Sequence, residues 1–476
     1  MSKLAACMLL AGLLAGTALA VTGPDKDQPK KLEARVDPRV ELMSLIFRLA
    51  GNNEYNQPLS KSPYSKEVDD HFGKFRDHKA VKFAQQLRKE HGASFDAVMS
   101  LAVHLEDTKG LKLKLPLEPR PERLDQRWPP DETKTFLKRL RAFVKDTGFN
   151  EFYDEHRKLY DAAAGRLTEE LNKRDYVGWF DKFFGERPGA KFYVVVGMLN
   201  GPCNYGSGIR FPDGKEEIIP VIGASKFDGD GIPVFGEGDV STIAHEFCHS
   251  YTNVFVDQHA DELKPAGEKI YETCASAMQR QAYGNWQTMF RESLVRACVV
   301  RYVRSTDGEE AAKKEIKDNH DRAFKWIGKL SDLLGEYESH RERYSTFDAF
   351  MPRVVEFFDG YVKEAKEQAG KAPKVIRMIP ENGATDVDPE LTEIKVFFDR
   401  PMLDKAWAVV GGGPNSPESA GKCHYEEGCK VFVLPVKLKP GWSYQFWLNR
   451  GQYNSFQSED GVELESVEVN FKTRAK

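Results

Sequence analysis

The sequence predicts an α+β protein, in which a mostly helical domain with a small inserted β-sheet is followed by an all-β domain. Helical periodicity extends over residues 36–185 and returns over 239–369. A β-branched and aromatic segment over 191–224 interrupts it, and short strands separated by turns follow from residue 373. With 476 residues, 41% of them hydrophobic, the chain can bury a substantial core, which excludes a disordered protein. A net charge of −4 excludes a general attraction to nucleic acid.

The N-terminal segment has the pattern of a secretory signal peptide. Lys3 precedes an uncharged apolar stretch over residues 4–20, and the tripeptide Ala-Leu-Ala that ends at Ala20 matches an A-x-A cleavage site. We expect cleavage after Ala20 and a mature protein that is secreted, periplasmic or held at the cell surface. Cys7 lies near the start of the apolar stretch instead of closing it, which argues against a lipoprotein signal. No later apolar run is long enough to span a membrane.

Local patterns place the first helices and the inserted sheet. Within 136–144 the apolar positions recur at i, i+1, i+4, i+7 and i+8, which is one face of a helix that Gly148 can end. Residues 192–196 form a continuous apolar run typical of a buried strand. Two further short strands, over 209–211 and 218–222, flank a Pro-Asp-Gly turn.

The C-terminal region is predicted to form a β-sandwich. Short strands are expected over residues 394–398, 431–433, 444–447 and 467–471, and turns rich in Gly, Pro and Asn separate them. The charged segment 364–374 is the expected linker. The predicted divisions are therefore a signal peptide over 1–20, a first domain over 21–372 and a second over 373–476.

Six cysteines remain after the expected signal peptide is removed. Cys423 and Cys429 are close in sequence, and we expect them to form a disulfide across a tight loop. For the other four, three pairings and free buried thiols all stay open; these are Cys203, Cys248, Cys274 and Cys298.

The chain contains one H-E-x-x-H motif, His-Glu-Phe-Cys-His over 245–249. On a helix His245 and His249 lie one turn apart on the same face, so both imidazoles can bind one Zn²⁺ ion. Glu246 lies beside them, where it can take a proton from a water that zinc activates. Asp239 is the expected N-cap of this helix. The alternative is an exposed helix with two incidental histidines.

A catalytic zinc needs a third protein ligand and an open position. The chain lacks the pattern that places a third histidine six residues after the motif, so a later glutamate is expected. Glu268 and Glu272 share their segment with polar residues, which is typical of a solvated helix face. Glu292 lies on a largely apolar face, and burial of a carboxylate is costly unless it is paired or binds metal. We expect Glu292 to be the ligand, with Glu268 in reserve, and a salt bridge to Arg296 as the alternative role.

Substrate positioning is predicted less directly. The segment 204–209 contains two glycines and can form a sheet edge to which an extended peptide adds beside the metal, or it can be an ordinary loop leading into a strand. Two tyrosines are candidates for stabilising the oxyanion. Tyr302 lies ten residues after Glu292 on the same expected helix, and Tyr205 lies in the glycine-containing segment.

Four segments carry a resemblance to a known family: Arg-Val-Glu-Leu over 39–42, Asp-His-Lys-Ala-Val over 77–81, the motif region 245–250, and residues 286–297. Together they make residues 38–369 resemble a bacterial family of unknown function, the DUF4932 type, whose members are exported and carry a zincin-like motif. The resemblance implies a gluzincin-like metallopeptidase with His245, His249 and Glu292 as ligands and Glu246 as base. The 42 residues between His249 and Glu292 exceed the usual gluzincin spacing.

A second resemblance covers the C-terminal region. Residues 379–387, Ile-Pro-Glu-Asn-Gly-Ala-Thr-Asp-Val, and residues 397–402, Phe-Phe-Asp-Arg-Pro-Met, resemble bacterial Ig-like domains of surface and secreted proteins. This resemblance implies an accessory domain for spacing, anchoring or contact with a cell-surface partner.

The leading expectation is an exported zinc-dependent peptidase that acts on a peptide or protein substrate. One alternative is a zinc-binding protein without proteolytic activity, either a pseudoenzyme or a hydrolase of another amide or ester. The other is a surface interaction protein that acts through its Ig-like domain. Bound zinc without peptide cleavage favours the first alternative, and absence of stoichiometric metal favours the second.

Overall fold

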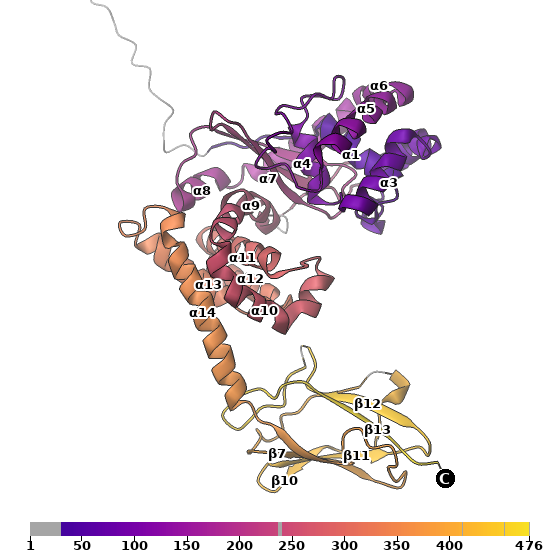
Figure 1. Cartoon of the computed structure of the whole chain (residues 1–476), viewed down its shortest axis with the longest axis vertical. Helices are drawn as coiled ribbons and strands as arrows, with labels where there is room; N and C mark the ends of the chain where they lie inside the picture. Colours follow the sequence, from indigo (N-terminus) through magenta and orange to yellow (C-terminus); the bar gives the residue numbers. More distant parts are fainter. Residues whose placement is uncertain (1–29, 237–239, 412, 452, 476) are drawn as a thin grey trace, which may run out of the picture.

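The computed structural model describes residues 30–236, 240–411, 413–451 and 453–475. The expected signal peptide and the expected helix cap Asp239 lie outside the described residues. Helices dominate the chain as far as Lys371, and strands dominate from Val375 onward. The expected class is confirmed at this level: a helical region with a small sheet is followed by a β region (Figure 1).

Amphipathic helices pack around the N-terminal core. They are α1 Pro38–Leu49, α2 Pro63–Phe72, α3 Lys79–His91, α4 Asp96–His104, α5 Pro130–Thr147, α6 Phe149–Glu155, α7 Arg157–Leu171 and α8 Tyr176–Phe184. The predicted stripe of α5 is buried, including Phe136, Leu140 and Phe143. The helix ends at Gly148, whose φ of 67° is the left-handed conformation that glycine adopts without strain.

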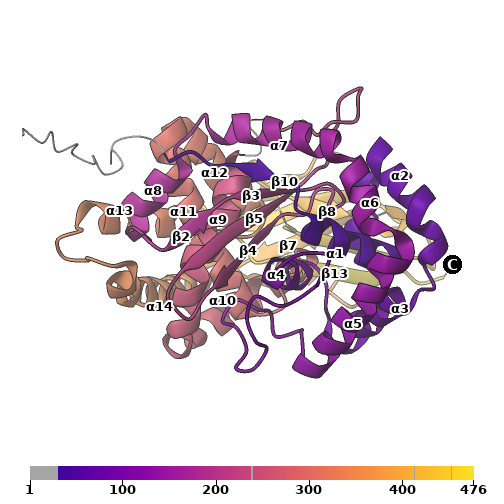
Figure 2. The same cartoon turned by 90° about the horizontal axis from the view of Figure 1, so that it is seen from above.

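A mixed sheet lies within this helical region. Its strands are β1 Ala34–Arg35, β2 Ala190–Phe192, β3 Val194–Gly197, β4 Tyr205–Arg210 and β5 Glu216–Gly223. The order of the parallel strands is β1-β3-β5-β2, in which β2 and β3 pair one after the other with the same side of β5. Strand β4 pairs antiparallel with the opposite side of β5. Strand β4 therefore forms an edge of the sheet. Figure 2 shows β3, β5 and β4 side by side, with α7 along the β1 side.

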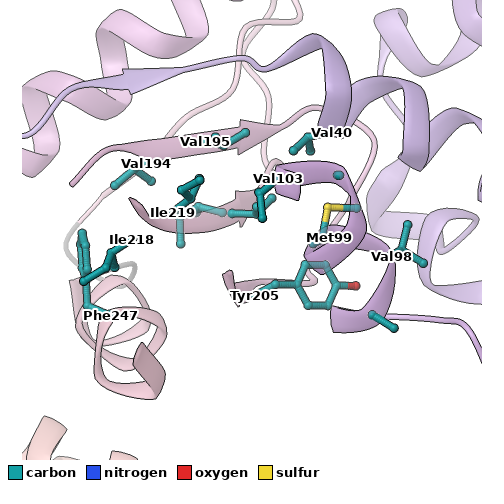
Figure 3. Packing of buried hydrophobic residues seen from close by; sticks show 14 of the residues in the cluster. Val40, Val98, Met99, Val103, Val194, Val195, Tyr205, Ile218, Ile219 and Phe247 are labelled. Carbon is teal, nitrogen blue, oxygen red and sulfur yellow. The ribbon is translucent and has the colours of Figure 1, made fainter. Parts of the chain in front are cut away.

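Helices cover both faces of this sheet. Because neighbouring residues of a strand point to opposite faces, Val194 and Val195 contact different layers. Figure 3 shows Val195 beside Val40 of α1, and Ile218 beside Phe247. Phe247 belongs to α9 (Val240–Gln258), which packs against β4 and β5. The sheet thus supports the helix that carries the motif.

A second group of helices follows the sheet, as expected for residues 239–369. They are α9, α10 Ala260–Arg280, α11 Trp286–Asp307, α12 Glu309–Asp321, α13 Ile327–Ser339 and α14 Phe347–Lys371. Helix α11 is the centre of this group and packs against α9, α10, α12 and α13 (Figure 1). Among the described residues, no helix combines the length and apolar character needed to cross a membrane.

Helix α14 leads into a C-terminal unit of two antiparallel sheets (Figure 1). The strands are β6 Val375–Ile379, β7 Glu393–Phe398, β8 Val409–Gly411, β9 Glu418–Ser419, β10 His424–Glu426, β11 Val431–Lys437, β12 Ser443–Leu448 and β13 Val467–Lys472. One sheet has the order β10-β11-β7-β6 with β9 beside β11, and the other has the order β13-β12-β8. Phe398 and Phe432 of the first sheet and Phe446 of the second belong to one buried cluster, separate from the core of the helical region.

The expected Cys423–Cys429 disulfide is wrong, because both residues are free thiols. Cys423 precedes β10, whereas Cys429 lies in the turn that joins β10 to β11. The three residues of β10 separate them by about 10 Å, more than a disulfide can span. The other four cysteines of the described chain are also free, and Cys248 and Cys298 lie side by side between α9 and α11.

Candidate metal site

Two helices bring three predicted ligands together. His245 and His249 lie one turn apart on α9, with 3.2 Å between their Nε2 atoms. Glu292 lies on α11, which packs along α9. Its Oε2 is 3.5 Å from His245 Nε2, and its Oε1 is 3.3 Å from His249 Nε2. One donor atom of each residue lies within 4.8 Å of the others, so this group could hold a metal ion.

Glu292 is buried and also paired within the protein. Its Oε2 accepts a hydrogen bond from the Tyr283 hydroxyl at 3.1 Å and lies 3.3 Å from Arg296 Nη2. Burial would raise the pKa of this carboxyl, but the neighbouring histidines, Arg296 and Tyr283 together hold the pKa below its ordinary value. The two roles expected for Glu292 therefore coexist: it faces the histidines while it pairs with Arg296.

Both histidines direct Nε2 toward the candidate metal position, and burial disfavours the charged form of His245. Burial lowers the pKa of His245 to about 3; Glu292 opposes this shift, and the nearby charges of His249, Arg296 and Arg322 add to it. His249 Nδ1 lies 3.3 Å from the side-chain oxygen of Asn253. If Nδ1 donates its proton there, the lone pair of Nε2 points toward His245 and Glu292.

Glu246 lies at the same site and is 7% exposed. Its side chain lines a pocket together with His245. Burial raises the pKa of Glu246 to about 7, Glu292 contributes to the rise, and His249 opposes it. A carboxyl with this pKa can both accept and release a proton near neutral pH.

The other two glutamates considered for the third ligand lie elsewhere. Glu268 is exposed on α10 and lies 3.8 Å from Lys264, and Glu272 is exposed on the same helix. Neither joins the His245–His249 pair within the described residues. The structure therefore selects Glu292 among the three.

Neither tyrosine expected to stabilise an oxyanion lies at the pocket. Tyr302 is fully buried, stacks on Tyr176 with ring centroids 5.3 Å apart, and meets Trp179 edge-on. Ten residues along an α-helix turn it about 80° away from the direction of Glu292. Figure 3 shows Tyr205 beside Met99 of α4. Burial raises the pKa of both hydroxyls, in keeping with their place in the core.

The structure instead places Tyr283 at the ligands. This residue lies in the loop between α10 and α11, and its hydroxyl donates to Glu292 and accepts from Arg296 Nη2 at 3.0 Å. Burial and the charge of Glu292 raise the pKa of Tyr283 to about 12, so the hydroxyl keeps its proton. Its sequence context, a short loop nine residues before Glu292, contains no periodic signal that indicates this role.

Strand β4 runs directly along the motif helix. A Cβ added to Gly206 would lie 2.6 Å from the backbone oxygen of Glu246 and 2.8 Å from His249 Cβ. The absence of a side chain at this position therefore permits the close approach. Of the two alternatives for residues 204–209, the structure shows a strand at the edge of the sheet, beside the metal ligands.

A pocket of about 750 Å³ opens at this site. Asn204 directly precedes β4, Arg174 precedes α8, and the rest of the lining comes from α9, α11 and α12. It consists of Ser241, Thr242, His245 and Glu246 of α9; Arg296, Val299, Val303 and Asp307 of α11; and Ala311, Lys314, Glu315, Asp318 and Asn319 of α12, with Arg322 at its end. His245 and Glu246 therefore line a pocket that is open to solvent.

The fold and the site define a mixed helix-and-sheet protein with a candidate metal centre. The chain belongs to the family described as Domain of unknown function (DUF4932), whose family model matches residues 32–357. No curated protein matches the sequence.

Solved structures match with low overall similarity. CopC from Methylosinus trichosporium OB3b is 13% identical with a TM-score of 0.17, over 22% of this chain and 94% of CopC. The S-layer protein rSbsC(31-844) is 16% identical with a TM-score of 0.16, over 48% of this chain and 33% of that protein. Domains 1–6 of surface layer protein SbsC are 15% identical with a TM-score of 0.16, over 49% of this chain and 33% of that one. The chain thus spans about a third of these surface-layer structures.

Proposed function

We propose that this chain is an exported zinc-dependent peptidase with a zincin-like catalytic domain. One observation carries the proposal: His245, His249 and Glu292 present converging donor atoms, and Glu246 lies beside them at an open pocket. Two imidazoles and one carboxylate form a donor set that suits catalytic zinc and leaves a coordination position open. Zinc bound there would act as a Lewis acid toward water and the peptide carbonyl.

The residues of the chain supply the proton transfers. Glu246 accepts a proton from the attacking water and delivers it to the nitrogen of the leaving amine. Tyr283 and Arg296 hold the carboxylate of Glu292 in place through their contacts with Oε2.

Strand β4 supports the choice of a peptide as substrate. It is an edge strand, antiparallel to β5, and it lies in contact with α9 at Gly206. An extended peptide can align with such an edge through backbone hydrogen bonds, which would carry its carbonyl groups past the metal ligands. The packing of the antiparallel edge strand β4 against the motif helix α9 also supports the zincin-like assignment.

The test uses purified residues 21–476 loaded with zinc. The Glu246→Gln variant should keep about one zinc per chain and lose at least about 100-fold in the cleavage rate of denatured casein and of a mixed peptide library. Glu272→Gln, an exposed substitution on α10, is the matched control and should leave both quantities unchanged. An unchanged rate in Glu246→Gln would refute the mechanism, and zinc without any cleavage would favour a non-proteolytic zinc protein.

The C-terminal unit is proposed to be an Ig-like accessory domain that contacts a cell-surface partner. Its own buried cluster, separate from that of the helical region, supports a unit that folds around its own core. If residues 373–476 bind such a partner without the first domain, this role is independent of the zinc site.

A further inference from the structure

The pocket contains an arginine side chain that is not engaged by the protein. Arg322 follows the last turn of α12 and lines the pocket together with His245 and Glu246. Its backbone carbonyl accepts a hydrogen bond from the Gln281 side chain. Within the described chain, no hydrogen bond or ion pair involves its guanidinium, which is exposed. A free guanidinium beside a candidate catalytic site is available to a ligand.

The other arginines of the pocket are already paired. Arg174 Nη1 lies 2.7 Å from Asp307. Arg296 contacts Glu292 at 3.3 Å and donates to Asn319 at 2.8 Å. Because Arg174 and Arg296 are already paired within the protein, their guanidinium groups are less available to a substrate than the guanidinium of Arg322.

Arg322 and the remaining cation of the pocket lie at different levels of α12. Lys314 forms no ion pair among the described residues, but it lies two turns before Arg322 on α12, about 12 Å along the helix axis. Because Arg322 lines the same pocket as His245 and Glu246, a negative group held by Arg322 would lie in the pocket that contains the proposed zinc site.

Within the described residues, the acidic side chains of the pocket form no ion pair with Arg322. Asp307 is paired with Arg174, and Glu315 accepts a hydrogen bond from Asn319 at 3.3 Å. Asp318, four residues before Arg322, is exposed and forms no ion pair with it. Glu315 also interacts electrostatically with Arg322, so an incoming carboxylate competes with the acidic side chains of Glu315 and Asp318.

We propose that Arg322 binds a carboxylate of the substrate and makes the site selective for peptides with a negative charge next to the cleaved bond. The proposal rests on the proposed peptidase function. The planar guanidinium can hold a carboxylate through two parallel hydrogen bonds. Val299, Val303 and Ala311 offer an apolar wall for the carbon atoms that lead to this carboxylate. The carboxylate has two sources: the C-terminus of the substrate, or an Asp or Glu side chain.

Binding of four hydroxamate probes to the zinc-loaded protein tests the proposal without requiring turnover. Each probe carries a succinyl hydroxamate that binds zinc, followed by alanine, alanine amide, glutamic acid amide or glutamine amide. The first pair compares a terminal carboxylate with its amide, and the second compares a side-chain carboxylate with its amide. Dissociation constants are measured by titration calorimetry at low and at high salt.

We expect one acidic probe to bind about tenfold more tightly than its neutral partner, with the preference reduced at high salt. The alanine pair would assign recognition of the substrate C-terminus, and the glutamate pair would assign an acidic side chain. Arg322→Gln should abolish the preference and leave binding of the neutral probes unchanged, and Arg322→Lys should retain part of it. Lys317→Gln is the matched control, because Lys317 lies on α12, pairs with Asp321 at 2.7 Å and does not line the pocket.

Equal binding of acidic and neutral probes by the wild type would overturn the proposal and leave the zinc site intact. A preference that persists in Arg322→Gln would overturn it as well. Failure of all four probes to bind, or absence of zinc, would refute the proposed function and this inference with it. Retained affinity for the neutral probes shows that the Arg322 variants are folded.

Discussion

Replacement of Glu292 by glutamine tests the metal site most directly. The change keeps the size of the side chain and removes the negative charge that faces His245, His249 and Arg296. Loss of one of three protein ligands should weaken zinc binding by at least about 100-fold, since even residues that only contact a ligand change metal affinity by about 10- to 100-fold.

The same substitution should also change the stability of the zinc-free protein. Glu292 and Arg296 are 6% and 7% exposed, and removal of one partner of a buried ion pair costs about 3–5 kcal/mol when the other is left unpaired. Here Arg296 keeps its bonds to Asn319 and Tyr283, and the amide oxygen of glutamine can still accept a hydrogen bond. We therefore expect the free energy of unfolding to fall by about 1–3 kcal/mol.

Zinc affinity is measured by competition with a colorimetric chelator, and stability by urea unfolding in the presence of EDTA. Glu268→Gln is the control, because Glu268 is exposed and should change the free energy of unfolding by less than about 0.5 kcal/mol. Zinc affinity of Glu292→Gln within about threefold of the wild type would refute the assignment of Glu292 as ligand.

Three further predictions follow from the structure. Tyr283→Phe removes the hydrogen bond to Glu292 and should weaken zinc binding by about tenfold; an unchanged chelator competition would contradict this positioning role. Gly206→Ala places a Cβ 2.6 Å from the backbone of α9 and should lower the free energy of unfolding by about 1–3 kcal/mol. The control Gly229→Ala places its Cβ in open space and should leave the free energy of unfolding unchanged. Equal urea midpoints for the two variants would show that β4 and α9 are further apart. Burial raises the pKa of Glu41 from 4.5 to about 8, so the folded state favours the protonated carboxyl and loses stability as pH rises between these values. Glu41→Gln should therefore lose less stability than the wild type between about pH 5 and about pH 9, and parallel urea-unfolding curves would contradict this.

Much of the fold was predictable because its signals are local. The apolar stripe of α5, the glycine that ends this helix, and the buried run at β3 all reflect interactions between residues close in sequence. Strand β1 gave no such signal, because its two residues are held in the sheet by pairing with β3, far away in the chain.

The residues of the candidate site also differ in whether local sequence was enough to predict their positions. The sequence by itself determined that His245 and His249 share a helix face, because four residues complete about one helical turn. Glu246 followed from the same motif. Tyr302, by contrast, was expected at the site from its helix alone, and packing against Tyr176 and Trp179 holds it in the core instead.

Only the tertiary structure decided which glutamate meets the histidines. Glu292 is separated from His249 by 42 intervening residues, and the packing of α11 against α9 brings its carboxylate to the imidazoles of His245 and His249. The loop between α10 and α11 brings Tyr283 to Glu292, and Arg322 at the end of α12 lines the pocket. The physical reason is that helical periodicity determines which residues share a face, whereas the packing of distant helices determines which faces meet.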